Sequence, residues 1–122
     1  MDTIEDSVLK NYFSHVPFAM KDDFLELITL METIAPEAVV NFQLGIPYFC
    51  QNNQLIYGIA AREDHIILYY PTLEDSFGFS SRLKQATLGN GCISFRRLAN
   101  INVNILSELL ALIKVNASRK IH

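Results

Sequence analysis

The sequence has little charge, no long apolar run and no leader-like start, and each shortage excludes a class of protein. Only 19% of its 122 residues are charged and 50% are apolar, which excludes the disordered class. No apolar run approaches the roughly 18 residues of a membrane span, and the acidic start at Asp2, Glu5 and Asp6 lacks the basic and apolar regions of a signal peptide. We therefore expect a single domain over residues 1–122 that is cytoplasmic and makes no contact with a membrane.

Signatures of catalysis, metal binding and nucleic-acid binding are also missing. Cys50 and Cys92 stand alone, without the C-x-x-C spacing of zinc or redox sites, and the histidines form no H-x-x-x-H pair. Thirteen acidic residues against ten basic ones give a net charge of −3, and the basic residues form no stripe that could follow a phosphate backbone. The sequence predicts a protein that is not an enzyme and does not bind nucleic acid.

Helical periodicity marks both ends of the chain. A Thr-x-x-Asp capping pattern at residues 3–6, followed by apolar residues at every fourth position, predicts a first helix over residues 3–15. Apolar stripes predict a second helix over residues 20–35, ending before Pro36, and a C-terminal helix over residues 102–117. A second capping pattern at residues 72–75 predicts a middle helical stretch over residues 72–88, interrupted near Gly78.

In the middle of the chain the apolar residues no longer follow a helical repeat and instead form short runs. Apolar runs of strand length cover residues 39–42, 48–50, 55–61, 65–70 and 92–96, with turn residues between them. Strands in the middle with helices toward the ends predict the α+β class, with a largely antiparallel central sheet of about 4–5 strands flanked by N-terminal, middle and C-terminal helices. Because the runs at 55–61 and 65–70 do not alternate with polar residues, we expect both faces of the sheet to be covered there.

The register of the hairpin formed by these two runs has two solutions. A three-residue loop places Tyr57 opposite Tyr69 and stacks both with His65 on one face of the sheet. A two-residue loop pairs Tyr57 with Tyr70 instead. The sequence leaves the choice open.

Acidic residues recur at helical spacing near both N-terminal helices. Asp2, Glu5 and Asp6 lie at i, i+3 and i+4 of the first predicted helix, and Asp22 and Glu26 lie at i and i+4 of the second. Such a ridge of carboxylates could hold a hard or borderline cation weakly. The alternative interpretation, which the residues by themselves favour, is that these charges offset the helix dipoles.

Tyrosines around the hairpin form the other candidate site. Tyr48, Tyr57, Tyr69 and Tyr70 cluster there with His65. Tyrosine carries a polar tip on an apolar ring, so these side chains could line a modest pocket with a few convergent polar groups. Ordinary core packing with the hydroxyls at the surface is the alternative.

Four short motifs follow one another along the chain. They are Ala-Pro-Glu-Ala at residues 35–38, Gly-Ile-Pro-Tyr-Phe at 45–49, Asp-His-Ile-Ile-Leu-Tyr at 64–69 and Gly-Cys-Ile-Ser-Phe at 91–95. In order and spacing, the region from residue 20 to residue 117 resembles the YdhG-like domain family of unknown function. The resemblance implies an antiparallel sheet flanked by helices. It also implies a role in carrying iron, because some members are described as frataxin-like iron chaperones.

Three functions are compatible with these observations. The first, implied by the resemblance, is a weak iron-binding chaperone without enzymatic activity. Its Fe(II) ligands would be the carboxylates of Asp2, Glu5, Asp6, Asp22 and Glu26. The second is a small-molecule binding module with a pocket around Tyr48, His65 and Tyr69, of which His65 and Tyr69 match the family pattern. The third is an interaction protein that self-associates as a homo-oligomer through exposed apolar surface.

Overall fold

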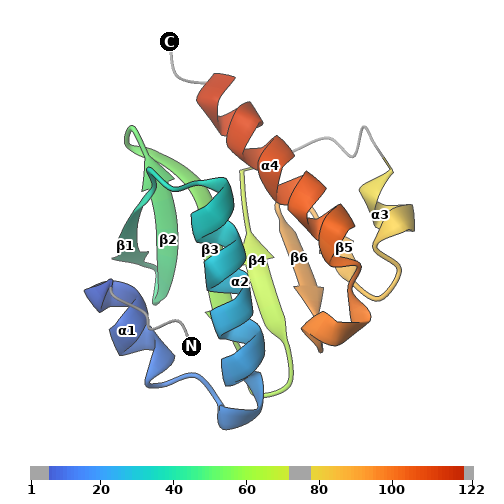
Figure 1. Ribbon diagram of the computed structural model, residues 1–122, viewed down its shortest axis with the longest axis horizontal. Coiled ribbons are helices and arrows are strands. Elements are labelled where there is room, and N and C mark those ends of the chain that lie inside the picture. Colours follow the sequence, from blue (N-terminus) through green and yellow to red (C-terminus); the bar gives the residue numbers. More distant parts are fainter. Residues whose placement is uncertain (1–5, 72–77, 120–122) are drawn as a thin grey trace.

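The protein combines one antiparallel sheet with helices, as the sequence predicts for the α+β class (Figure 1). The computed structural model describes residues 6–71 and 78–119. In chain order the elements are α1 (Ser7–Phe13), α2 (Lys21–Ile34), β1 (Val39–Gln43), β2 (Ile46–Gln51), β3 (Gln54–Ala61), β4 (Ile66–Tyr69), α3 (Phe79–Arg82), β5 (Thr87–Gly89), β6 (Cys92–Phe95) and α4 (Val103–Arg119). Short 3-10 helices over Phe18–Met20 and Leu98–Asn100 precede α2 and α4.

The sheet has six strands in the order β1-β2-β3-β4-β6-β5, and all neighbouring strands are antiparallel. The prediction of about 4–5 strands misses β5 (Thr87–Gly89), because it places residues 87 and 88 at the end of a helix and Gly89 in a turn. Leu88 instead lies opposite Ile93 in the sheet and packs against the core. Of the predicted middle helix, α3 is the part observed, and the capping pattern at residues 72–75 lies outside the described residues.

The helices at the two ends of the chain behave largely as their apolar stripes predict. Asp6 caps α1, since its carboxylate accepts hydrogen bonds from the backbone N–H groups of Val8 and Leu9 at 2.9 and 3.1 Å. The helix therefore begins at Ser7, and residues 3–5 of the predicted first helix lie outside the described residues. The α2 helix ends at Ile34, before Pro36, as predicted. None of the described helices is long and apolar enough to cross a membrane.

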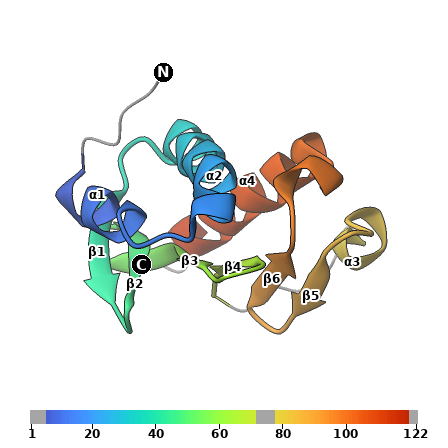
Figure 2. The same cartoon turned by 90° about the horizontal axis from the view of Figure 1, so that it is seen from below.

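One face of the sheet carries α1, α2 and α4 (Figure 2). The core lies between these helices and the sheet. Its fully buried members include Phe24, Leu27 and Met31 of α2, Leu106 and Leu110 of α4, and Ile59, Ile66, Leu68 and Ile93 of the sheet. Tyr57 connects the sheet to α4, because its hydroxyl donates a hydrogen bond to the backbone carbonyl of Leu110 at 2.8 Å.

The opposite face, which we call the open face, corrects the expectation that both faces are covered. The views agree that α1, α2 and α4 all lie on the other side of β2, β3 and β4 (Figure 2). The apolar run of β3 does not alternate because its open-face positions are Gly58 and Ala60, which are small and buried although no helix of that layer covers them. In the part of the chain that the structure describes, an uninterrupted apolar run therefore arises without a second layer of helices.

The β3–β4 hairpin has the two-residue loop. Gly58 lies opposite Tyr69, and the backbone N–H of Arg62 donates to the carbonyl of His65 at 2.8 Å, which closes a loop of two residues. The three-residue alternative, with Tyr57 opposite Tyr69, is therefore wrong. Because side chains alternate along a strand, Tyr57 points toward the helices while Tyr69 lies on the open face.

Candidate functional site

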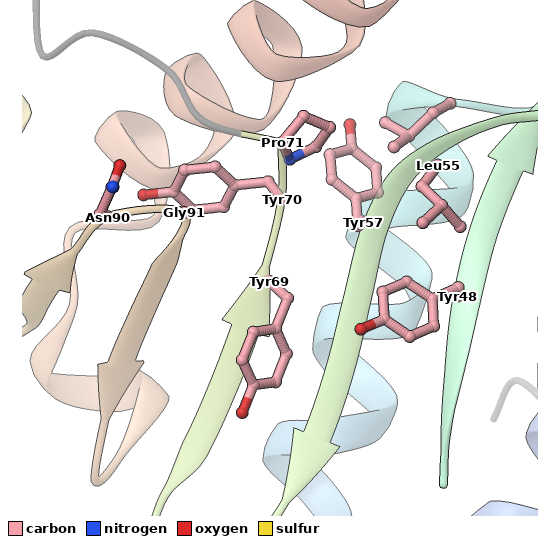
Figure 3. Close-up of a pocket in the computed structure, with 9 residues that line it drawn as sticks. Tyr48, Leu55, Tyr57, Tyr69, Tyr70, Pro71, Asn90 and Gly91 are labelled. Atoms are coloured by element: carbon pink, nitrogen blue, oxygen red, sulfur yellow. The ribbon is translucent and has the colours of Figure 1, made fainter. Parts of the chain in front are cut away.

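A row of directly opposed residues crosses the open face from β2 to β6. Tyr48 lies opposite Gly58, Gly58 opposite Tyr69, and Tyr69 opposite Cys92. Directly opposed residues in a sheet point to the same face. Tyr48 of β2 and Tyr69 of β4 therefore stand on one face, on either side of Gly58. Figure 3 shows these two rings on either side of β3.

Gly58 allows this arrangement. A Cβ atom at this position would lie 2.5 Å from Cε1 and 2.8 Å from Cδ1 of Tyr48. The Tyr48 ring thus lies directly against the backbone of β3, and Figure 3 shows its hydroxyl directed across β3 on the side where Tyr69 stands. Any larger residue at position 58 would displace the ring.

The surroundings of Tyr48 shift its ionisation. Burial raises the pKa of Tyr48 above its ordinary value near 10, and the nearby Tyr69 adds to the rise, since two phenolates would repel. At neutral pH the Tyr48 hydroxyl is therefore protonated and can donate a hydrogen bond. It supplies a polar tip at the edge of an apolar surface.

These residues open onto a cavity of about 420 Å³, which we call the aromatic groove (Figure 3). It runs from the row described above to the ends of β3 and β4 and the β5–β6 turn. Its lining residues are Tyr48, Leu55, Ile56, Tyr57, Tyr69, Tyr70, Pro71, Asn90 and Gly91. The far wall is fixed by Tyr70, whose hydroxyl donates to the carbonyl of Cys92 at 3.3 Å and whose N–H donates to the carbonyl of Gly91 at 2.9 Å.

A β-bulge brings the aliphatic wall of the groove into place. Phe49 of β2 lies opposite Tyr57, whereas the next residue, Cys50, lies opposite Leu55, so Ile56 is an extra residue on β3. A bulge re-aims the side chains beside it. Leu55 thereby shares the open face with Tyr48 and contributes an apolar side to the groove.

Of the three predicted ligand-binding residues, Tyr48 and Tyr69 line the aromatic groove and His65 does not. Tyr48 and Tyr69 come together, but His65 precedes β4 at the opposite end, about 13 Å along the strand from Tyr69 at about 3.3 Å per residue. Its Nδ1 lies 2.7 Å from a carboxylate oxygen of Asp64. A separate polar hollow of about 360 Å³ is lined there by Asp64, His65, Gln85, Thr87, Ser94, Phe95 and Arg96.

The Asp64–His65 contact predicts a measurable acid titration. The hydrogen bond from His65 holds the pKa of Asp64 below its ordinary value of 3.8. The interaction is therefore fully present above that value and is lost as the pH falls through the lowered pKa. We expect an NMR titration of the Asp64 carboxyl carbon to show a pKa closer to 3.8 in His65→Ala than in the native sequence. The variant His15→Ala, altered on an exposed histidine of a different element, should leave Asp64 unchanged; an equal response in both variants would contradict the assignment.

The structure also separates the carboxylates predicted to hold a metal. Asp2 and Glu5 lie outside the described residues, and Asp6 uses its carboxylate to cap α1. Asp22 and Glu26 are exposed on α2. Within residues 6–71 and 78–119, no group of three or more His, Cys, Asp or Glu side chains is arranged to hold a metal ion.

Several residues of the aromatic groove were not predicted as site residues. Leu55, Asn90 and Gly91 were assigned only to a strand and a turn. The signal that could have found them is Gly58 between two tyrosine-bearing strands, combined with the two-residue hairpin loop that sets Gly58 opposite Tyr69. Choosing the register fixes which side chains share the open face.

Comparison with known proteins identifies a similar fold. No family model and no curated protein sequence matches this chain. The crystal structure of a protein from the DUF1801 family, YdhG of Bacillus subtilis, matches it with a TM-score of 0.76 and 12% sequence identity, over 91% of each chain. The predicted resemblance to YdhG-like proteins is thus confirmed by the structure, and at this identity the likeness concerns the fold.

Proposed function

We propose that this protein binds a small, flat and largely apolar organic molecule in the aromatic groove, without transforming it. The observation that carries the proposal is the placement of Tyr48 and Tyr69 on either side of Gly58, on a face of the sheet that α1, α2 and α4 leave uncovered. Aromatic rings that remain accessible on both sides of a small residue offer stacking surface to a planar ligand.

The size and lining of the groove support this proposal. Its volume of about 420 Å³ falls within the range of roughly 300 to 1,000 Å³ that is usual for ligand sites. Tyrosine hydroxyls and the Asn90 side chain supply a few polar groups that can orient a ligand, while Leu55 and Pro71 supply apolar contact.

Binding rather than catalysis fits the chemistry of the lining. Among the described residues that line the groove there is no acid, histidine, lysine or cysteine. The raised pKa of Tyr48 keeps its phenol protonated at neutral pH, so it can donate a hydrogen bond but is not poised to accept a proton. The described part of the lining therefore has groups that recognise a ligand and holds no pair that would activate one.

A fluorescent probe tests the groove directly. We expect 8-anilinonaphthalene-1-sulfonate to bind the native protein and to bind Tyr48→Ala/Tyr69→Ala at least about tenfold more weakly, because both stacking surfaces are removed. Phe18→Ala is the matched control, since it deletes an aromatic ring that is 90% exposed and is not among the residues that line the groove. Equal affinity for all three proteins, each shown to be folded by circular dichroism, would contradict the proposal. Native mass spectrometry of the purified protein then reports the mass of any natural ligand that copurifies.

Iron carriage is the finer role that the family resemblance implies, and it rests here on the exposed pair Asp22 and Glu26, one helical turn apart on α2. Two carboxylates with open access to water support only weak binding. An anaerobic Fe(II) titration should lose its heat in Asp22→Asn/Glu26→Gln and keep it in Glu63→Gln. No heat with the native protein, or no loss in the double variant, would dismiss this role.

A further inference from the structure

The outer edge of β1 is an unusual edge for a monomer. β1 is an end strand of the sheet, and Figure 1 shows no other described element beside its outer edge. Residues 38–61, which contain β1, β2 and β3, include no Asp, Glu, Lys, Arg or His. Natural edge strands are usually short, or carry charge or proline that discourages pairing with another chain. The other edge, β5, follows the first pattern with three residues, but β1 has five and no charge.

Apolar side chains are concentrated along this edge. Val39 is 62% exposed and Phe42 56% exposed, and they point to opposite faces of the strand. Leu44, in the β1–β2 turn, is 91% exposed and has a φ of +53°, a conformation that a bulky residue rarely adopts. The edge therefore presents apolar surface above, below and at its end.

The hairpin geometry shows which backbone groups face outward. Gln43 and Ile46 flank the two-residue Leu44–Gly45 turn and exchange both of their backbone hydrogen bonds in such a hairpin. Hydrogen-bonded pairs alternate along an antiparallel ladder, so the N–H and C=O groups of Phe42 and Val40 point away from β2. The position of Pro47 opposite Phe42 agrees, since proline has no N–H to give to β1.

We propose that a second copy of this chain covers the edge, with β1 pairing antiparallel to the partner's β1 around a two-fold axis at Asn41. In this register Val40 lies opposite the partner's Phe42. The N–H and C=O groups of Val40 and Phe42, which point away from β2, then pair with the same groups of the partner strand. The two six-stranded sheets join into one continuous sheet.

Self-complementarity is what selects a second copy as the occupant. Val40 and Phe42 meet the partner's Phe42 and the partner's Val40, so the outward donors and acceptors of both strands are satisfied by the same pairing. The four side chains form one apolar cluster on the helix side of the joined sheet. On the open side, the Asn41 amide meets the amide of the partner's Asn41 and can exchange hydrogen bonds with it. No charge on either strand opposes the approach.

The first test is the mass in solution. We expect sedimentation equilibrium at about 100 µM to give a dimer, and Phe42→Lys to raise the dissociation constant by roughly tenfold or more, because a lysine on each strand brings two like charges into the seam. Thr87→Lys is the matched control, since it adds the same charge at an exposed position of the other edge strand and should leave the dimer intact. A monomeric native protein at this concentration, or equal weakening by both variants, would overturn the proposal.

Disulfide trapping tests the register independently of any weakened variant. In a non-hydrogen-bonded antiparallel pair the Cα atoms are about 4.5 Å apart, which a disulfide can bridge. In the background Cys50→Ala/Cys92→Ser, we therefore expect Asn41→Cys to form a covalent dimer under mild oxidation. Gln43→Cys should not, because its thiol would face the partner's Val39 and lie roughly 13 Å from its own counterpart. Crosslinking of both variants to the same extent, or of neither, would exclude the pairing.

Discussion

Replacing Tyr57 with alanine should lower the free energy of unfolding by about 3 to 5 kcal/mol, the largest effect that we expect from a single substitution. The side chain is only 1% exposed and lies between β3 and α4. Its removal leaves a void between the sheet and the helices. It also deletes the ring whose centroid lies 6.2 Å from that of Phe49. Denaturant unfolding monitored by circular dichroism measures the loss.

Tyr57→Phe separates the hydroxyl from the ring. We expect a loss of about 1 kcal/mol at neutral pH, because the hydrogen bond to the carbonyl of Leu110 disappears while the packing stays. Burial raises the pKa of Tyr57 far above its ordinary value near 10. The phenol is therefore ionised in the unfolded chain but not in the folded one at alkaline pH, and stability falls as the pH rises above about 10. The phenylalanine variant should lose this part of the alkaline destabilisation, and an unchanged pH profile would contradict the role given to burial.

The sequence predicted the helices best where an apolar stripe and a terminator coincide. In α2 the buried positions Phe24, Leu27 and Met31 repeat at helical spacing, and Pro36 prevents the helix from continuing. These are local properties, so no knowledge of the rest of the chain is needed. The same holds for the tight turn at Asn52 and Asn53, which both adopt positive φ values of 52° and 63°.

Features that depend on distant partners were predicted less well. β5 has only three residues, and what makes it a strand is the pairing of Leu88 with Ile93 and of Thr87 with Ser94. The covering of the sheet was also misjudged, because a run of apolar residues has the same appearance whether a helix or a neighbouring side chain buries it. Gly58 shows the difference: the atoms nearest to a Cβ added there belong to Tyr48.

The candidate site was half predicted. Tyr48 and Tyr69 were correctly placed near each other, since both lie on strands that border β3. His65 was grouped with them because residues four apart along a strand share a face, but this separation places His65 about 13 Å from Tyr69, before the start of β4. The register, which decides whether Tyr57 or Gly58 lies opposite Tyr69, is settled by the Arg62–His65 backbone hydrogen bond that closes the loop.

Gly58→Ala should combine a moderate loss of stability with a changed groove. The added methyl would start 2.5 Å from the Tyr48 ring, so the ring must swing away from β3, at a cost of about 1 to 3 kcal/mol. Gly58 has no positive φ, so the backbone itself accepts alanine. We therefore expect lower stability together with weaker binding of 8-anilinonaphthalene-1-sulfonate, because the displaced ring no longer forms one side of the stacking surface.

A double-mutant cycle with Tyr48→Ala isolates the contact between the ring and the glycine. Without the ring, the three closest contacts of the added methyl are gone, so Gly58→Ala should be close to neutral, or stabilise the fold by up to about 1 kcal/mol, because alanine restricts the unfolded chain more than glycine does. The coupling energy between the two positions should then exceed about 1 kcal/mol. If Gly58→Ala instead costs the same in both backgrounds, the glycine is required for a reason other than the Tyr48 ring, and the aromatic groove would lose the feature that defines its shape.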